Sequence, residues 1–145
     1  MDYTFYFPKD KVPEQTRKEV ADFLYEHLDQ FGDKHEYITK CINFALDDQE
    51  KFGGFVLVSR DGDRITGAVV VNKTGMGGYI PDNILVYIAV HKDYRGQGLG
   101  RKLMEKTFEK AKGDIKLHVE PENPARHLYE KLGFTSKYLE MRRTQ

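Results

Sequence analysis

The residues best suited to chemistry form a glycine-rich loop in the second half of the chain. The loop reads Val90-His91-Lys92-Asp93-Tyr94-Arg95-Gly96-Gln97-Gly98-Leu99-Gly100-Arg101 and lies between an apolar run and an amphipathic segment. This order predicts a strand, the loop and then a helix. The first turn of a helix has unpartnered N–H groups and a partial positive charge, which suit a pyrophosphate. An ordinary glycine-rich turn between strand and helix is the alternative interpretation.

Two better-known phosphate-binding loops fit this segment less well. A Walker A loop ends in Gly-Lys followed by Ser or Thr, whereas this loop ends in Gly100-Arg101-Lys102. A dinucleotide-binding loop is closer, because Glu120 ends the next expected strand about twenty residues further on, where an acid binds ribose. However, the glycines follow a Gly-x-Gly-x-Gly pattern, and no second βαβ half follows. We regard the dinucleotide-binding interpretation as the weaker one.

Apolar periodicity predicts the elements that position this loop. In the first half we expect an opening strand over residues 2–7, followed by two amphipathic helices. The first helix covers 13–32, with Gly32 as its cap, and the second covers 38–45. A hairpin follows, with strands over 55–58 and 65–71. The apolar run 84–90 lacks polar alternation, so we expect a central strand that is covered on both faces. The remaining elements alternate between helix and strand, over 99–112, 115–120, 124–132 and 135–141.

This order of elements defines the expected fold class. It reads β-α-α-β-β-β-α-β-α-β, with one βαβ crossover after an antiparallel region. We therefore expect a mixed α/β (α+β) fold whose mostly antiparallel central sheet is flanked by helices, within one domain that spans residues 1–145. A doubly wound repeat of βαβ units is not expected.

Charge and composition exclude several classes of partner. The chain has 23 basic residues (Lys and Arg) and 23 acidic residues (Asp and Glu). There is therefore no basic surplus for binding nucleic acid or an anionic membrane. The longest apolar run, 84–90, is too short to span a bilayer, and the N-terminus lacks the basic region of a signal peptide. We expect a cytoplasmic protein without nucleic-acid or membrane partners.

Cysteine and histidine positions give no sign of a disulfide or a metal site. Cys41 is the single cysteine and lies on the apolar stripe of the second expected helix, where a buried thiol is the natural interpretation. The histidines form no set with the spacing of metal ligands. We predict no metal.

Two segments resemble the motifs of one enzyme superfamily. Arg95-Gly96-Gln97-Gly98-Leu99-Gly100 resembles the Arg/Gln-x-x-Gly-x-Gly/Ala signature of the GNAT acetyltransferases. Asn123-Pro124-Ala125-Arg126-His127-Leu128-Tyr129-Glu130-Lys131-Leu132-Gly133-Phe134 resembles their second motif, Asn…Ala…Leu-Tyr-Glu-Lys-Leu-Gly-Phe. The two segments stand at the family's spacing, and the expected element order matches its sheet. The resemblance therefore covers essentially the whole chain.

The resemblance implies acetyl-CoA as cosubstrate and a set of residues that bind it. In relatives the pyrophosphate lies on backbone N–H groups of the glycine loop, while the arm pairs with the end of the preceding strand. The corresponding residues here are Ile88, Ala89, Val90, Arg95, Gly96, Gln97, Gly98, Leu99, Gly100 and Arg101. Asn123 matches the motif's asparagine, which hydrogen-bonds the arm in relatives; a helix cap before Pro124 is the alternative role.

The resemblance also implies two catalytic residues. Tyr129 corresponds to the tyrosine that relatives place near the cofactor sulfur, where a phenol assists the departing thiolate. Its helical stripe with Leu128 and Leu132 also fits a core residue. The run 84–90 lacks the carboxylate base of many relatives, and His118 stands where others carry theirs. A partly solvated histidine without catalytic duty is the alternative, with Asp82, Glu120 or water as base.

The expected activity is transfer of an acetyl group from acetyl-CoA to a primary amine by direct attack in a ternary complex. The acceptor amine, whether a small molecule, a peptide N-terminus or a lysine, is not identified. Residues 76–79 match a place where relatives line the acceptor pocket, and a mobile hairpin tip fits them equally well. A non-catalytic, CoA-binding sensor or interaction module is the alternative function. By analogy with relatives, a homodimer is an expected assembly.

Overall fold

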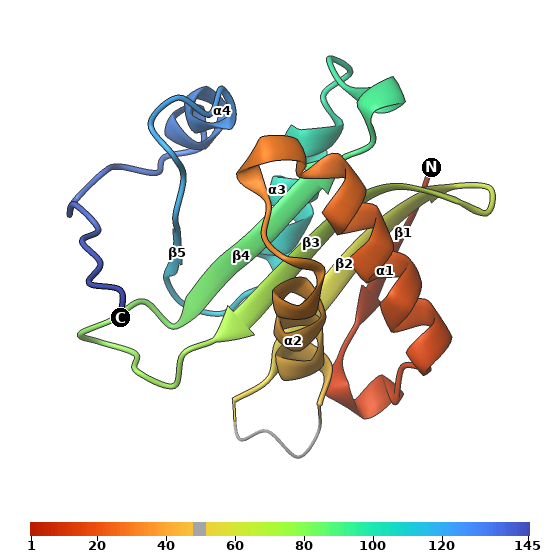
Figure 1. Ribbon diagram of the computed structural model, residues 1–145, viewed down its shortest axis with the longest axis horizontal. Helices are drawn as coiled ribbons and strands as arrows, with labels where there is room; N and C mark the ends of the chain where they lie inside the picture. The colour runs from red at the N-terminus through yellow and green to blue at the C-terminus, as the bar shows by residue number, and fades with distance from the viewer. Residues whose placement is uncertain (48–51) are drawn as a thin grey trace.

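A computed structural model describes residues 1–47 and 52–145, which form a five-stranded sheet in the order β1-β2-β3-β4-β5 (Figure 1). The strands are β1 (Asp2–Tyr6), β2 (Gly54–Asp61), β3 (Arg64–Lys73), β4 (Asn83–Val90) and β5 (Ile115–Leu117). The helices are α1 (Glu14–His27), α2 (His35–Leu46), α3 (Leu99–Lys110) and α4 (Ala125–Lys131), with short 3-10 turns η1 (Pro8–Asp10), η2 (Asp29–Phe31) and η3 (Lys92–Tyr94). Neighbouring strands are antiparallel except β4 and β5, which are parallel. The predicted mixed sheet is confirmed.

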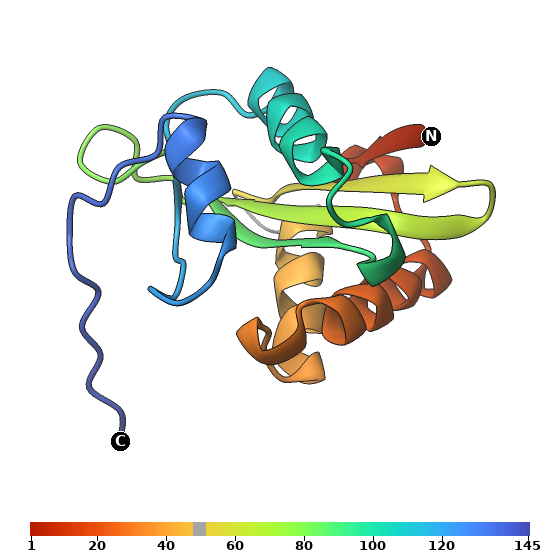
Figure 2. The same cartoon turned by 90° about the horizontal axis from the view of Figure 1, so that it is seen from above.

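Helices cover both faces of this sheet (Figure 2). α1 and α2 pack on one face, where Leu24, Ile38 and Ile42 are fully buried; α3 and α4 pack on the other with Leu103 and Met104. Each face of the sheet therefore has its own apolar cluster, as expected for a sheet whose two faces both exclude water. No helix of the described segments is long and apolar enough to cross a membrane.

β4 differs from the prediction of a strand covered on both faces. Its residues alternate between buried and partly exposed, whereas residues 55–59 of β2 and 66–71 of β3 are buried without interruption. Its neighbour β5 pairs only with Asn83, Ile84 and Leu85 and then diverges (Figure 1). The rest of β4 does not pair with β5. We call the place where the two strands separate the β4–β5 fork.

A bulge stands at the base of the fork. In the pairing of β3 with β4, Val70 lies opposite Tyr87 and Val71 lies opposite Leu85, so Val86 is an extra residue on β4. A bulge of this kind bends and twists the strand that carries it. The bulge lies between the part of β4 that pairs with β5 and the part that does not.

One predicted strand is absent and two predicted element ends are wrong. Residues 135–141 form no strand, and Tyr138, Leu139 and Met141 are at least 80% exposed. β5 ends at Leu117, three residues before the predicted end. A strand needs a ladder partner, and the three residues of β5 offer a short one. α1 ends at His27 because Asp29 takes a left-handed conformation with φ of 53°; Gly32 caps the η2 turn instead.

Candidate active site

The glycine loop leads from the end of β4 into α3, as predicted. Gly96 and Gly98 have φ values of 76° and 80°, a region that favours glycine, and a Cβ at either position would meet no atom within 4 Å. A Cβ at Gly100 would lie 3.4 Å from Leu128 Cδ2 and 3.8 Å from Val90 Cγ2. The first two glycines thus shape a backbone surface that faces open space. The third allows α3, α4 and β4 to approach one another.

The N-terminus of α3 has a geometry and a charge that suit an anion. The first intrahelical bond runs from Lys102 N–H to the Gly98 carbonyl at 3.1 Å, so the N–H groups from Gly98 to Arg101 precede the helical ladder. The first turn of α3 carries no acidic residue, and Gly98 brings no side-chain cap. Four outward N–H groups and the positive end of the helix dipole suit a pyrophosphate.

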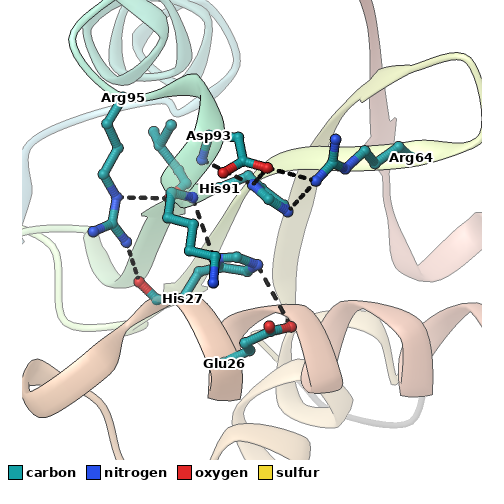
Figure 3. A network of polar contacts seen from close by, with 8 residues as sticks. Glu26, His27, Arg64, His91, Asp93 and Arg95 are labelled. Carbon is teal, nitrogen blue, oxygen red and sulfur yellow. Dashed lines mark hydrogen bonds and ion pairs between the residues drawn. The ribbon is translucent and has the colours of Figure 1, made fainter.

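Arg95 fixes the loop from below rather than extending into the open space. Its Nε donates to the Val90 carbonyl at 3.1 Å, and its Nη2 donates to the His27 carbonyl at 2.8 Å. Nη1 forms an ion pair with Asp29 at 3.1 Å, and Figure 3 shows the bond between Arg95 and the His27 carbonyl. The guanidinium is therefore engaged with protein atoms at the end of α1. The Arg95 side chain is nevertheless 45% exposed, so a ligand can also contact it.

Two stacked histidines lie beside the same loop (Figure 3). The rings of His27 and His91 are 4.1 Å apart between centroids, and His27 Nδ1 accepts a hydrogen bond from Lys92 N–H at 3.3 Å. His91 Nδ1 accepts from Asp93 N–H at 3.1 Å, and the Asp93 carboxylate pairs with Arg64 at 2.9 Å. Lys92 and Asp93 are the first residues of η3. The backbone N–H group of Lys92 is thus bonded to the His27 ring, and that of Asp93 to the His91 ring.

The ladder pattern decides which β4 residues face the fork. His91 N–H donates to the Thr66 carbonyl at 2.8 Å, and bonded pairs alternate along an antiparallel ladder. Ala89 therefore bonds towards β3, while the backbone groups of Ile88 and Val90 point to the fork. The Val90 carbonyl receives Arg95 there, and Ile88 offers both its N–H and its C=O. Of the three predicted strand residues, Ala89 does not face the fork, and its side chain is in the α1–α2 core.

Tyr129 combines a buried ring with a reachable hydroxyl. The residue is 7% exposed, and its ring packs edge-on against Phe134 at 6.0 Å in the cluster that contains Leu85 and Leu99. Burial raises the pKa of its phenol to about 12. Within the described residues the hydroxyl has no hydrogen-bond partner, yet it is not among the side-chain atoms sealed from water. Tyr129 is both a core residue and a hydrogen-bond donor whose hydroxyl is not sealed from water.

The other predicted site residues have more ordinary surroundings. Asn123 Oδ1 accepts a hydrogen bond from Ala125 N–H at 2.9 Å, so its cap role is confirmed and contact with the cofactor arm stays a prediction. His118 and Glu120 are exposed beyond the end of β5. Asp82 accepts from Asp114 N–H at 3.0 Å and stands before β4, at the end opposite the glycine loop. That location leaves Asp82 the poorest candidate for the base.

A further pair was not found by sequence reasoning. The Tyr87 hydroxyl donates to Asp33 Oδ2 at 2.8 Å, on the α1–α2 face just beyond the Val86 bulge. Burial, together with that bond, raises the pKa of the Tyr87 phenol. In the described segments no cation lies within ion-pair distance of Asp33, whereas Asp22, Asp29 and Asp93 each have one. The two residues are 54 positions apart, so no local pattern reveals them.

Two remaining features concern metals and the single thiol. In residues 1–47 and 52–145, no group of three or more His, Cys, Asp or Glu side chains is placed to hold a metal ion.

Burial raises the pKa of the Cys41 thiol to about 12, and Asn72 Nδ2 donates to its sulfur at 3.4 Å. A thiol with so high a pKa is a poor nucleophile at neutral pH.

Comparison with known proteins shows the family of this chain. Residues 51–136 match the acetyltransferase (GNAT) domain family. Over 85 residues the chain is 34% identical to N-alpha-acetyltransferase 30 of Schizosaccharomyces pombe; this alignment covers 55% of the chain and 57% of that relative. The chain thus spans little more than half the length of the curated relative that it matches.

Solved structures agree over the full length. Ribosomal-protein-alanine N-acetyltransferase from Brucella melitensis biovar Abortus has a TM-score of 0.68 at 19% identity, with 100% of both chains covered. Aminoglycoside antibiotic 6'-N-acetyltransferase from Acinetobacter haemolyticus has a TM-score of 0.72 at 14% identity, covering 100% of this chain and 98% of that one. At these identities the likeness shows the fold alone. With the family's sequence pattern over more than half its length and the same fold throughout, the chain belongs to the GNAT family of N-acetyltransferases.

Proposed function

We propose that this protein transfers an acetyl group from acetyl-CoA to a primary amine by direct attack in a ternary complex. The observation that carries the proposal is the arrangement around the β4–β5 fork. An anion site at the N-terminus of α3, outward backbone groups on Ile88 and a reachable Tyr129 hydroxyl all adjoin the same cluster of side chains. GNAT acetyltransferases use acetyl-CoA, and these features fit its pyrophosphate, its amide-containing arm and its sulfur.

Backbone groups carry most of the proposed cofactor binding. The N–H groups from Gly96 to Arg101 receive the pyrophosphate, since the space above Gly96 and Gly98 is open. Ile88 continues the β ladder to the arm, because β5 no longer occupies that edge of β4. Leu99 and Gln97 contribute through their backbone positions in the same loop. Arg95 supports this surface through its bonds to Val90 and His27.

Acetyl-CoA supplies an acetyl group that is activated as a thioester. In the proposed step a C–N bond to the amine forms and the C–S bond breaks, and the amine proton passes to a base or to water. Tyr129 donates a hydrogen bond to the departing sulfur. A thiol has a pKa of about 8.5, so complete proton transfer from a phenol with a pKa near 12 is unfavourable. Tyr129 therefore stabilises the thiolate, which takes its proton from solvent.

We assign the base role to His118 or to a water molecule that it holds. His118 is exposed one residue beyond the end of β5, the strand that forms one side of the fork. Neutral imidazole accepts a proton near physiological pH. Glu120 is two residues further along and is the next candidate.

The acceptor is proposed to approach from the α1–α2 face. The opposite face at the fork is occupied by α3 and α4 (Figure 2). The Asp33 carboxylate, held by the Tyr87 hydroxyl, gives the α1–α2 face a negative charge without a paired cation in the described segments. This charge favours an ammonium group. The similarity to an N-alpha-acetyltransferase supports a peptide N-terminus, while lysines and small amines share the same chemistry.

A non-catalytic CoA-binding module is the second candidate. The absence of any carboxylate in β4 favours it, since many relatives carry a base in that strand. Release of free thiol from acetyl-CoA in the presence of an amine panel separates the two candidates. The enzyme produces thiol and acetylated amine in equal amounts, both dependent on the amine. A module binds CoA by calorimetry and releases no thiol above the rate without protein.

A further inference from the structure

We infer that His27 is a positioning residue for the coenzyme loop, and that the loop keeps its binding conformation only while His27 is neutral. The expected effect on CoA binding rests on the proposed function, whereas the link between His27 and the loop rests on the geometry of the loop. His27 is the last residue of α1 and is 5% exposed. No step of the proposed reaction uses His27. Because a buried histidine needs partners for both ring nitrogens, its contacts show what it does in the fold.

The bonds of His27 specify one protonation state. Nδ1 lies 3.3 Å from the Lys92 nitrogen, whose N–H is the donor, so Nδ1 must carry a lone pair. The ring proton of the neutral form is therefore on Nε2, which lies 3.6 Å from the Glu26 carboxylate. A second proton on Nδ1 would face the Lys92 N–H directly. Protonation thus converts a hydrogen bond into a contact between two donors.

Burial and two neighbouring side chains oppose that second proton, while two carboxylates favour it. From the loop side, His91 stacks on the ring at 4.1 Å, and Arg95 donates to the His27 carbonyl at 2.8 Å. From α1 and η2, the Glu26 and Asp29 carboxylates favour the charged form. Desolvation is the largest effect and His91 the next, so the pKa of His27 is lowered from its usual value. Phe23, at 4.6 Å between ring centroids, adds no charge.

The bond from Lys92 connects His27 to the phosphate site. Lys92 begins η3, and three residues later Arg95 leads into the glycines that shape the anion surface. When Lys92 N–H loses its acceptor, this end of the loop loses its bond to the His27 ring, while Arg95, the His91–Asp93 turn, the Arg64 pair and the Tyr94–Asp61 bond remain. The N–H groups that must converge on a pyrophosphate then belong to a less firmly fixed backbone. Coenzyme affinity should therefore fall when His27 is protonated.

The direction with pH follows from the lowered pKa. Above pH of about 6.5 His27 is neutral in the folded and unfolded chain, and the loop is intact. As pH falls through the lower folded-state pKa, His27 becomes charged in the folded protein. Because binding requires the neutral form, the affinity for CoA should fall about tenfold per pH unit below that pKa.

The test is CoA binding by calorimetry between pH 8 and pH 5, with three variants of the full chain. His27→Asn keeps an acceptor oxygen where Nδ1 stands but does not titrate, so it should bind CoA with a shallower pH dependence. His27→Phe keeps the ring but has no acceptor, and it should bind CoA about tenfold more weakly at pH 8. His35→Asn changes an exposed histidine on α2 and should behave as wild type. The phosphate of the coenzyme titrates in the same way with wild type and with the three variants, so it does not affect the comparison between them.

Equal pH slopes for wild type and His27→Asn would overturn the inference, as would wild-type affinity in His27→Phe. Proton NMR of the free protein gives a second readout that does not need coenzyme. The Lys92 and Gly96 amide signals should shift at the pKa of His27, and they should not shift in His27→Asn. If the amides move but wild type fails to bind CoA at pH 8, the proposed function is wrong while the loop coupling stands. Amides that stay fixed through the His27 titration contradict the coupling itself.

Discussion

The guanidinium Nη2 of Arg95 lies 2.8 Å from the carbonyl oxygen of His27, 68 residues away in sequence. Through this bond the end of α1 is fixed to the loop that precedes α3. Arg95 also contacts the Val90 carbonyl, so one side chain joins α1, β4 and the loop. The arginine of the sequence signature therefore acts as a structural clamp beneath the anion site.

Replacing Arg95 with Lys should weaken CoA binding about tenfold, because one ammonium group cannot reach three acceptors in the way that a planar guanidinium does. Isothermal calorimetry at pH 8 measures the effect. Asp29→Asn is the matched control, since it removes only the exposed ion pair and keeps both bonds to carbonyls. An Arg95→Lys variant with wild-type affinity would mean that the clamp does not shape the site.

A negative charge in the glycine loop should abolish CoA binding. Gly98→Glu places a carboxylate in open space above the α3 N-terminus, where the pyrophosphate is proposed to lie. Gly98→Ala is the control, because it adds the same backbone strain at a φ of 80° without the charge. We expect at least a hundredfold loss of affinity between the Ala and Glu variants by calorimetry. Equal affinities would place the phosphates elsewhere.

Sequence periodicity predicted the elements of this fold better than their ends. The hairpin between β2 and β3 and the α3 helix are confirmed because their signals are local: a turn sequence in one case and an apolar stripe in the other. The end of α1 depends on the left-handed Asp29, and the coverage of β4 depends on where β5 diverges. Neither is encoded within a few residues.

The site shows the same division. The glycine loop and Tyr129 were predicted because they form contiguous motifs. The Arg95 clamp, the His27–His91 stack and the Tyr87–Asp33 bond each join residues more than fifty positions apart. Such contacts exist only once the chain has folded. Ala89 was wrongly grouped with its neighbours on the fork, because a sequence does not show which alternate residues bond to β3.

The Asp33 carboxylate should contribute to amine binding. Asp33→Asn keeps a hydrogen-bond acceptor for the Tyr87 hydroxyl but removes the charge, so KM for the amine should rise about three- to tenfold. The kcat at saturating amine should change little. Glu36→Gln removes an exposed charge from the first turn of α2 and serves as the control. An unchanged KM in Asp33→Asn would remove this residue from the acceptor site.

The role of His118 should appear in the pH dependence of the amine half of the reaction. At saturating acetyl-CoA, where titration of His27 affects binding least, wild type should show an acidic limb in kcat/KM for the amine. His118→Ala should lower kcat/KM by about a hundredfold and remove that limb, with CoA affinity unchanged. Glu120→Gln is the comparison variant. An acidic limb that persists in His118→Ala but is absent from Glu120→Gln would transfer the base role to Glu120.

The most direct test of the central claim is the rate of amine-dependent thiol release by wild type and Tyr129→Phe at saturating acetyl-CoA. Wild type should release one thiol for each amine acetylated. The Phe variant retains the buried ring and should keep the same CoA affinity, but loss of the hydrogen bond to sulfur should lower its kcat about a hundredfold. Equal rates in the two proteins, or no amine-dependent release by wild type, would contradict acetyl transfer at the β4–β5 fork.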